Sequence, residues 1–427
     1  MEKIVKQELF PGVQLICLPT DRFKTGCLSI TFRRPLLYQE VSMNALCAPI
    51  LLRGTGKYPT MQALTAAAEE LYGAEIGPVL RRRGTSQCFG LAADFIDGRF
   101  APGGEDILKG IVELMASLLL DSAGDEDSFV KEYFLTERKN LERTIDSRIN
   151  DKGAWSHRRL LELMCPNEPY AIDLLGSHSE LARLDEKTLR AHWKKVLSEA
   201  PVLIYYGGSE SPERVAELFK TNFASLAHRS APTPAVPPVI GKAPEEPRFH
   251  EHTMPVMQSR LCMGWRFETD KPLEYAPGVV FNTLFGGSSG SKLFLNVREK
   301  LSLCYSVDSE IDRRAALMFA SAGVEDEDTQ VCMEEIIAQL EACAKKEISE
   351  QELDNAKACI INALELTADS PGSLESYYTT KAWWGESMRI PSEAIPEVEA
   401  VTVDDVARIA SMARLDTVFV LHGEVEE

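Results

Sequence analysis

The stretch LDEKTLRAHWKKVLSEAPVLIYYGG (Leu184–Gly208) predicts an amphipathic helix followed by an apolar strand. The stretch VTVDDVARIASMARLDTVFVLHGE (Val401–Glu424) repeats this pattern, and its first residue lies 217 positions after Leu184. Thr402 and Asp405 have the Ser/Thr-x-x-acid spacing that marks a helix start. A helix-strand unit that recurs near the end of each half of the chain predicts an internal duplication.

Two apolar strands extend the repeat toward the start of each half. FKTGCLSITF (Phe23–Phe32) and SRLCMGWRF (Ser259–Phe267) both read as buried strands, with a cysteine in matching places. The six prolines of APTPAVPPVIGKAPEEP (Ala231–Pro247) are incompatible with a helix or a central strand. We therefore predict an N-terminal lobe over 1–228, a linker over 229–247 and a C-terminal lobe over 248–427.

Long helical patterns separate the predicted strands. They cover 60–72, 107–120, 127–145, 328–345 and 350–366, and Ser211 followed by Pro212 has the composition of a further helix start. Because the strands are grouped rather than strictly alternating with helices, they favour an α+β fold with helices packed on a mostly antiparallel sheet. Two such lobes joined by a linker predict a clam-shell.

Composition narrows the classes of function. The chain of 427 residues has a net charge of -19, which argues against nucleic acid and anionic lipid as partners. No window approaches the roughly 20 apolar residues of a membrane span, and the N-terminal segment lacks the pattern of a secretory signal. The ten cysteines are scattered without a Cys-x-x-Cys pair, which favours reduced core thiols. We expect a soluble, cytoplasmic protein.

Two side-chain clusters have structural interpretations. The basic run Arg81–Arg83 is isolated, and we expect a solvated strand or turn there. Tyr377, Tyr378, Trp383 and Trp384 recur at helical spacing, which indicates a core or the wall of a chamber before it indicates a ligand cage.

Residues that bind metals or act as nucleophiles are sparse. The first 156 residues contain no histidine, so this part of the chain has no imidazole to hold a metal. His250 and His252 share one face of a probable strand, a spacing that can bind metal, but without an evident third ligand solvated edge-strand histidines are favoured. Cys47 has no histidine near it in sequence, which favours a buried structural thiol over a nucleophile.

The segment NALCAPILLRGTGKY (44–58) resembles the zinc-binding helix of the M16 peptidases, the family of pitrilysin and the mitochondrial processing peptidase. In that family a helix with His-x-x-Glu-His runs into an ending that Leu52–Thr55 resembles. The resemblance places Ala45 and Pro49 at the two histidine positions and Ala48 at the glutamate position. Two histidines four residues apart share one helix face and bind zinc, and the glutamate polarises the attacking water. All three functional groups are missing here.

A later helix supplies the third zinc ligand, a glutamate, in M16 peptidases. TERKNLERTIDSRINDK (136–152) resembles that helix, and its best matching position is Thr144, which cannot replace a carboxylate ligand. Glu142 or Asp146 would take the place in a different register. The resemblance therefore implies an N-terminal lobe without its own zinc site.

The second half keeps the residues that the resemblance leads us to expect. GGSSGSKLFLNVREKLSLCYSV (286–307) is similar to the M16 segment in which an arginine and a tyrosine seven residues apart face the catalytic zinc. Here these are Arg298 and Tyr305, and both side chains are suitable donors to a developing oxyanion. The structural alternative is an ion pair of Arg298 with Glu299 or Asp308 and a Tyr305 that only packs. The similarity of the whole segment favours the functional interpretation.

The resemblance implies a non-catalytic subunit of a heterodimeric peptidase. Such a chain would have no cofactor of its own and would supply Arg298 and Tyr305 to a catalytic M16 paralogue that holds the zinc. Together they would act on a peptide or an unfolded polypeptide; the isolated chain would be free to form a homodimer. The chain also looks like the zinc-less M16 proteins of Gram-positive bacteria associated with 5-aminopentanol modification of elongation factor P. Two alternatives stay open: a structural or peptide-binding protein, and a hydrolase with an unrecognised site.

Overall fold

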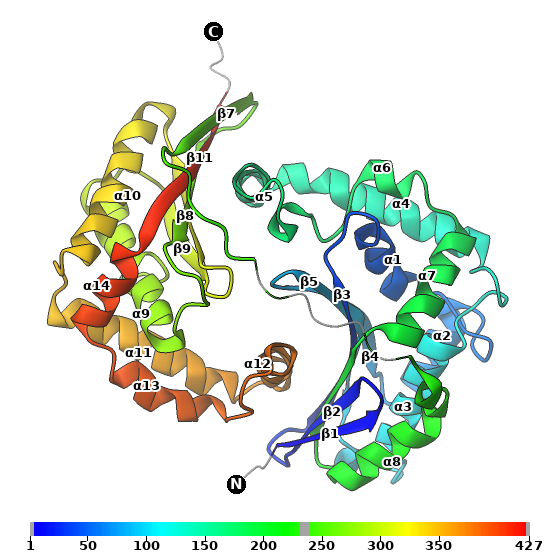
Figure 1. Cartoon of the computed structure of the whole chain (residues 1–427). Coiled ribbons are helices and arrows are strands. Elements are labelled where there is room, and N and C mark those ends of the chain that lie inside the picture. The colour runs from blue at the N-terminus through cyan, green and yellow to red at the C-terminus, as the bar shows by residue number, and fades with distance from the viewer. Residues whose placement is uncertain (1–3, 231, 233–236, 238, 424–427) are drawn as a thin grey trace. The chain divides into compact units, whose positions relative to one another are not determined.

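The computed structural model describes residues 4–230, 232, 237 and 239–423, and these fall into two compact units (Figure 1). The first unit contains 1–146, 172–237 and 367–388, and the second contains 147–171, 238–366 and 389–427. Each unit thus includes a segment from the other half of the sequence. The predicted ranges 1–228 and 248–427 describe the halves of the chain, whereas the compact units exchange one segment each. Most of the predicted linker lies outside the described residues or in irregular structure before Arg248.

The first unit is built on a six-stranded sheet with the order β1-β2-β6-β3-β5-β4. All neighbouring strands in it are antiparallel except β2 and β6, which are parallel. The strands are β1 (Val5–Phe10), β2 (Val13–Pro19), β3 (Thr25–Pro35), β4 (Glu75–Arg83), β5 (Ser86–Ile96) and β6 (Val202–Gly208).

Both faces of this sheet are covered. Alternate residues of β6 point to opposite faces, so that Ile204 joins the core under several helices and Tyr205 joins a smaller core under α12 alone. The helices of this unit are α1 (Val41–Leu51), α2 (Met61–Glu69), α3 (Ile107–Leu120), α4 (Lys131–Ser147), α6 (His178–Leu181), α7 (Glu186–Glu199), α8 (Pro212–Asn222) and α12 (Pro371–Trp384).

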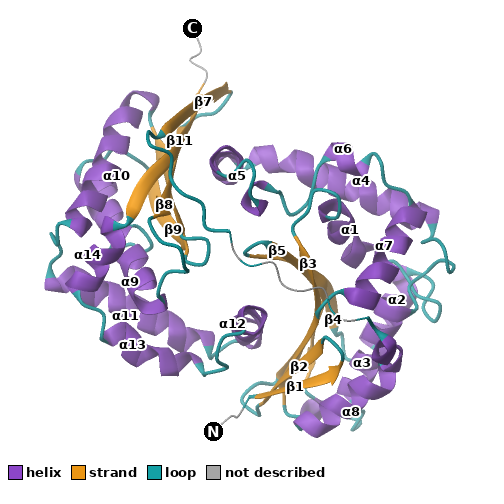
Figure 2. Cartoon of the chain, viewed as in Figure 1, coloured by secondary structure: helices purple, strands orange, loops and turns teal. Residues whose placement is uncertain are grey.

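The second unit has a five-stranded sheet with the order β7-β11-β8-β10-β9. Its one parallel pair is β11 with β7, and the other neighbours are antiparallel. This order repeats that of the first sheet from β2 onward. Figure 2 distinguishes the strands from the helices that surround them in each unit. The strands are β7 (Arg248–Met254), β8 (Ser259–Phe267), β9 (Ser306–Asp312), β10 (Leu317–Val324) and β11 (Ala413–Gly423).

The second sheet is also covered on both faces. On β8, Met263 packs into the main helical core, whereas Cys262 faces a smaller core beneath α5. The helices of this unit are α5 (Lys152–Met164), α9 (Tyr275–Phe285), the π-helix η5 (Leu293–Lys300), α10 (Thr329–Ala344), α11 (Glu350–Thr367), α13 (Ile395–Glu399) and α14 (Val403–Ser411). The predicted α+β fold with mostly antiparallel sheets is confirmed.

A buried ion pair holds each exchanged segment on its sheet. On α12, Glu375 accepts hydrogen bonds from Ser29 of β3 (2.8 Å) and from Arg81 of β4 (2.7 Å). In the second unit, Arg266 of β8 donates to Glu168, which follows α5 (2.6 Å), and to Asp416 of β11 (2.7 Å). Buried carboxylates of this kind need charged partners, because an unpaired charge in a core is costly.

Arg81–Arg83 lie in a strand, as one of the two predicted alternatives had it, but the expectation that they are solvated is wrong. These residues form the end of β4 and are half-buried, and Arg81 reaches the buried carboxylate of Glu375. The aromatic cluster on α12 is a core element as predicted, since Tyr378 is buried and stacks on Tyr205 at 6.4 Å between ring centroids. Sequence alone assigned α12 to the wrong unit, because its partner strands lie about 170 to 360 residues earlier in the chain.

The other predicted elements agree closely with the structure. The predicted helix at 107–120 is α3, residue for residue, and the strand at Ser259–Phe267 is β8. Thr402 and Asp405 form the expected capping box of α14. None of the helices in the described part of the chain has the length and apolar content that a membrane crossing needs.

Candidate functional site

Helix α1 carries the three positions that the family resemblance aligns with the zinc motif. Ala45 and Ala48 are buried, with 7% and 3% of their surface exposed, and Pro49 lies inside the helix. A proline there removes the backbone N–H that would donate to the carbonyl of Ala45. Methyl groups and a pyrrolidine ring offer no lone pair to a metal ion. The helix is therefore an apolar packing element at the positions where the family resemblance places zinc ligands.

A buried polar network fixes α1 against its neighbours. Asn44 donates to the side chain of Gln87 on β5 (2.8 Å), and its carbonyl oxygen lies 2.7 Å from Nε2 of His192 on α7. Burial lowers the pKa of His192 to about 4, so the imidazole is neutral at pH 7. Just before α1, burial alone would raise the pKa of Glu40, but hydrogen bonds from Arg34 and Lys195 lower it to about 2.

This network predicts acid sensitivity of the first unit. Both pKa values lie below their ordinary values of 6.5 for His192 and 4.5 for Glu40, so the unfolded chain binds more protons in acid. The histidine contribution is complete above pH 6.5 and is lost as the pH falls toward 4; that of Glu40 is lost between pH 4.5 and 2. Urea unfolding at pH 7 and pH 4.5 should show a loss on the order of 2 kcal/mol from His192. His192→Gln should flatten this dependence, and an unchanged slope in the variant would refute the assignment.

The predicted position of the third ligand, Thr144, lies on α4. Thr144 is exposed, and its hydroxyl donates to the carbonyl of Asn140 (3.0 Å). Of the two alternatives for this position, Glu142 pairs with Arg138 at 3.7 Å and Asp146 lies 2.8 Å from His178. Within the described residues, no group of three or more His, Cys, Asp or Glu side chains is arranged to hold a metal ion.

A buried carboxylate on α4 is engaged elsewhere. Glu137 is 8% exposed and forms an ion pair with Arg53, which follows α1 in the segment resembling the end of the zinc motif. Asn140 donates weakly to the same carboxylate (3.4 Å). The pair links the end of α1 to α4 and leaves Glu137 a structural residue.

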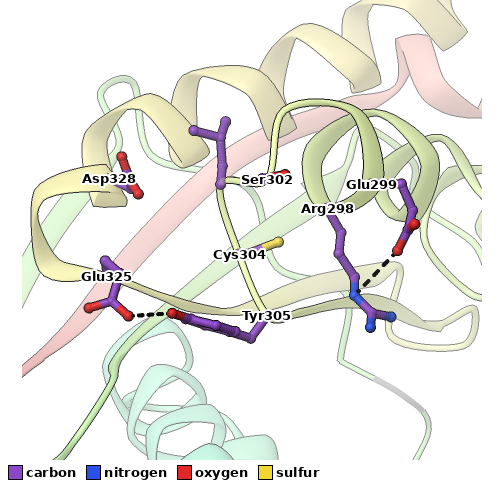
Figure 3. A pocket seen from close by; sticks show the side chains of 8 residues that line it. Arg298, Glu299, Ser302, Cys304, Tyr305, Glu325 and Asp328 are labelled. Carbon is purple, nitrogen blue, oxygen red and sulfur yellow. Dashed lines mark hydrogen bonds and ion pairs between the residues drawn. The ribbon is translucent and has the colours of Figure 1, made fainter.

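Arg298 and Tyr305 line one pocket of about 460 Å³ in the second unit (Figure 3). Arg298 comes from the π-helix η5, and Tyr305 directly precedes β9. The other residues that line the pocket are Glu299, Ser302, Leu303, Cys304, Glu325 and Asp328. The structure thus brings the two predicted residues into a common pocket. Their assignment as functional donors stays a prediction.

Local structure explains how this segment presents both side chains. On η5, the side chain of Val297 is buried, whereas that of the next residue, Arg298, is half-exposed. Ser302 has a φ of 55°, and this left-handed residue turns the chain back toward the sheet. The backbone N–H of Tyr305 then donates to the carbonyl of Gly323 on β10 (2.9 Å). The Tyr305 ring projects outward and is 59% exposed.

Both side chains already interact with carboxylates of their own unit (Figure 3). The hydroxyl of Tyr305 donates to Glu325 (2.7 Å), and this hydrogen bond raises the pKa of Tyr305. Arg298 forms an ion pair with Glu299 at 3.7 Å, and its guanidinium stacks 4.6 Å from the ring centroid of Phe294. The side chains of Arg298 and Tyr305 therefore point toward different partners, and the predicted alternative of an Arg298–Glu299 pair is present.

Sequence reasoning missed Glu325 and Asp328 as pocket residues. They lie in the acidic run Glu325–Asp328, which on its own is typical of a solvated loop. Only the pairing of β10 with β9 brings the end of β10 next to Tyr305. No short-range signal in the sequence identifies them.

The remaining candidates have structural roles. His250 and His252 lie on β7, an edge strand as predicted, and the His252 ring is 5.6 Å from that of Trp155. Cys47 is fully buried, and burial raises the pKa of its thiol, as expected of a structural cysteine.

The comparisons with known proteins agree on one family. Residues 183–359 match the family described as "Peptidase M16 inactive domain". A protein of Bacillus subtilis, "Probable inactive metalloprotease YmfF", is 28% identical over 418 residues, which cover 96% of each chain. The chain is a member of the M16 peptidase family. Another B. subtilis relative, "Uncharacterized zinc protease YmxG", is 24% identical over 70% of this chain and 71% of its own.

Solved structures share the M16 fold. A conserved protein from Enterococcus faecalis superimposes with a TM-score of 0.91 at 24% identity, covering 99% of both chains. A peptidase M16 inactive domain from Pseudomonas fluorescens has a TM-score of 0.83 at 14% identity and covers 100% of this chain and 99% of its own. Within the M16 family, this chain lacks the histidines of the zinc motif, because no histidine precedes His157.

Proposed function

We propose that this chain is the non-catalytic subunit of an M16-type heterodimeric zinc peptidase. One observation carries the proposal: Arg298 and Tyr305 line a common pocket. The family resemblance, for its part, aligns Ala45, Ala48 and Pro49 of α1 with the zinc motif. A chain of this kind contributes half of a peptide chamber and two donors. The zinc and the water-activating glutamate belong to a catalytic paralogue that keeps His-x-x-Glu-His.

The chemistry required of the two donors is limited. Attack of water on a peptide carbonyl places negative charge on its oxygen, and prepositioned donors stabilise that charge. The Arg298 guanidinium supplies a permanent positive charge. The Tyr305 phenol supplies a neutral O–H donor, and the hydrogen bond to Glu325 keeps it protonated by raising its pKa. A peptide or an unfolded polypeptide is the substrate class that such donors serve.

When the partner and a substrate bind, Tyr305 and Arg298 must give up the contacts that they make in the isolated chain. The Tyr305 hydroxyl is 2.7 Å from Glu325, and a substrate carbonyl has to replace that acceptor. Both side chains are long and partly exposed, so a change of rotamer is sufficient. The ion pair of Arg298 with Glu299 is solvated and costs little to break.

Reconstitution tests the proposal. The purified chain is mixed with an M16 protein of similar length, from the same organism, that carries His-x-x-Glu-His. Cleavage of a quenched-fluorescent peptide library is followed for each protein alone and for the mixture. We expect the mixture to cleave at least ten times faster than the sum of its components. A mixture no faster than the catalytic protein alone would reject the proposed subunit role.

Both donors already interact with carboxylates of the same unit. This observation favours a second candidate function, that of a structural or peptide-binding M16 protein without a role in turnover. Under this alternative, Glu325 and Glu299 hold Tyr305 and Arg298 as they do in the isolated chain. A mixture that forms a stable complex, but whose turnover does not respond to substitution of either donor, would support it.

The remaining expectations belong to the same proposal. A cytoplasmic location, a homodimer of the isolated chain and the origin of the two lobes by duplication are consistent with a zinc-less M16 subunit. The matching strand orders of the two sheets support the duplication. The resemblance to proteins associated with modification of elongation factor P suggests a substrate to include among the tested polypeptides.

A further inference from the structure

A second pocket in the second unit lies between the sheet and α5, the helix that covers this face of the sheet (Figure 1). Its volume is about 370 Å³, which is within the range of small-molecule sites. It is lined by residues of α5, β8, β9 and β10, and these differ from the residues that line the pocket of Arg298 and Tyr305. The zinc motif and the two donors leave this second pocket without a role.

Strand pairing places the polar residues of this pocket on one face of the sheet. Cys262 of β8 lies opposite Ser321 of β10, and Ser321 lies opposite Asp308 of β9. Arg260 and Gly323 form the adjacent row, two residues along their strands. Side chains directly opposite each other, and side chains two positions apart on one strand, share a face. The cation of Arg260 and the carboxylate of Asp308 therefore project into the same pocket beneath α5.

The two charged groups are not paired within the described part of the chain. Nε of Arg260 is buried without a hydrogen-bond partner, and neither Arg260 nor Asp308 forms a side-chain hydrogen bond or ion pair there. The other carboxylate of the pocket, Glu310, is 3.1 Å from Nε2 of His157 on α5. Buried polar groups in native proteins are normally hydrogen-bonded. The guanidinium of Arg260 and the carboxylate of Asp308 are thus available to a ligand.

Gly323 allows the guanidinium of Arg260 to lie across β10. A β-carbon at Gly323 would be 2.5 Å from Nη1 of Arg260 and 3.1 Å from Oγ of Ser306. The absence of a side chain on β10 therefore brings the guanidinium beside the hydroxyl of Ser306 on β9. A carboxylate at this point accepts hydrogen bonds from both groups, and the planar guanidinium suits a carboxylate especially well.

We propose that this pocket binds a small zwitterion, with its carboxylate on Arg260 and Ser306 and its ammonium group on Asp308. Charge complementarity selects this class of ligand. A simple anion is repelled by Asp308 and Glu310, and a simple cation is repelled by Arg260. Only a molecule that carries both charges is attracted at both ends. Asp308 is exposed on β9, an edge strand, which opens this end of the pocket to the ligand.

The spacing of the two charges sets the length of the ligand. Asp308 lies one strand and two residues away from Gly323, over which the guanidinium is placed. For strands about 4.8 Å apart and a rise of about 3.3 Å per residue, the two Cα atoms are roughly 8 Å apart. An extended chain of two or three residues spans about 7–10 Å. A di- or tripeptide, or an ω-amino acid of similar length, therefore fits, whereas the charges of a single α-amino acid are too close together.

Calorimetric titration of the full-length chain at pH 7 tests the proposal with three related peptides. They are trialanine with free termini, N-acetyl-trialanine and trialanine amide. We expect trialanine to bind with a Kd below about 1 mM, and each capped form to bind at least about ten times more weakly, because each cap removes one charged contact. Absence of trialanine binding in the millimolar range, or equal binding of all three peptides, would overturn the proposal.

A fourth probe distinguishes the two sources of such a zwitterion. 6-Aminohexanoate carries a carboxylate and an ammonium group at a similar separation but has no peptide bond. We expect it to bind as tightly as trialanine if the pocket recognises the charges alone, and more weakly if the peptide groups also contribute. Binding of 6-aminohexanoate that persists when neither charged residue is present would refute recognition by Arg260 and Asp308.

Variants assign each end of the ligand to one residue. Arg260→Met should bind trialanine and its amide equally, and Asp308→Asn should bind trialanine and its N-acetyl form equally. The matched controls are Arg414→Met and Asp354→Asn, which change exposed residues of the same unit outside the pocket and should leave the Kd unchanged. A variant that still discriminates against its matching capped peptide would contradict the assignment. If Arg260→Met fails to fold, Asp308→Asn, at an exposed position, decides the matter.

This inference goes beyond the proposed subunit function and is tested separately from it. Every titration uses the isolated chain, and no titration depends on a catalytic partner or on turnover. Zwitterion binding in a chain that gives no peptidase activity with its paralogue would reject the subunit role alone. Conversely, an active mixture whose isolated non-catalytic chain binds none of the four probes would reject the pocket ligand alone.

Discussion

Replacing Arg298 with alanine should lower the kcat of the reconstituted mixture by about 10² to 10³-fold, because loss of one oxyanion donor has an effect of that size in other hydrolases. The loss should be in kcat more than in KM, since the donor acts on charge that develops only in the transition state. The quantity to measure is the initial rate of peptide cleavage at saturating substrate, with equal amounts of wild-type or variant chain bound to the partner.

Tyr305→Phe should also lower the kcat of the mixture, since it removes the donor hydroxyl and keeps the ring. Lys300→Ala is the matched control for Arg298, because Lys300 is an exposed cation at the end of the same π-helix and does not line the pocket. Tyr38→Phe is the control for Tyr305. It also removes the hydroxyl of an exposed tyrosine, but Tyr38 belongs to the first unit, whereas Tyr305 belongs to the second. Turnover that falls equally for variants and controls would contradict donors at Arg298 and Tyr305.

Arg266→Met should destabilise the second unit by roughly 3–5 kcal/mol, the range expected when one partner of a buried ion pair is removed. Arg266 is 3% exposed and donates to Asp416 (2.7 Å) and to Glu168 (2.6 Å). Asp416 has no exposed surface, and among the described residues it would keep its pair with Arg248 and the neighbouring Thr417 hydroxyl. Urea denaturation followed by the fluorescence of the buried Trp265 measures the change.

Arg260→Met is the control for this substitution. Arg260 lies on the same strand, and among the described residues its side chain makes no hydrogen bond or ion pair of the kind that Arg266 makes. Its replacement should change the unfolding free energy by less than about 1 kcal/mol. Equal effects of the two substitutions would indicate that the Arg266 network contributes no more than ordinary packing.

Most of the fold was predictable because its signals are local or periodic. The amphipathic pattern of 107–120 and the apolar run of Ser259–Phe267 specify α3 and β8. The repeated helix-strand unit indicated two similar lobes, and the two sheets share a strand order. The exchange of α5 and α12 between the units was not predictable, because neither helix carries a local signal of the sheet on which it packs.

In the candidate site, too, some features were predictable from residue identity and others depend on tertiary contacts. The prediction of a missing zinc site rests on the family resemblance, which places Ala45, Ala48 and Pro49 at the motif positions, and no histidine precedes His157 to restore the motif in another register. Arg298 and Tyr305 line one pocket, and their role as donors stays a prediction. The orientations of their side chains depend on Glu299 and on Glu325, and the latter reaches the site only through strand pairing. Tertiary contacts of that kind leave no trace in a single sequence.

The zinc content of the pure chain tests the central claim most directly. The protein is incubated with excess zinc, passed through a desalting column and assayed by mass spectrometry for metal per chain, with a His-x-x-Glu-His paralogue treated in parallel. We predict that the paralogue retains about one zinc ion, because it has the ligands, and that this chain retains none. One tightly bound zinc ion per molecule of this chain, held in its first unit, would contradict the account.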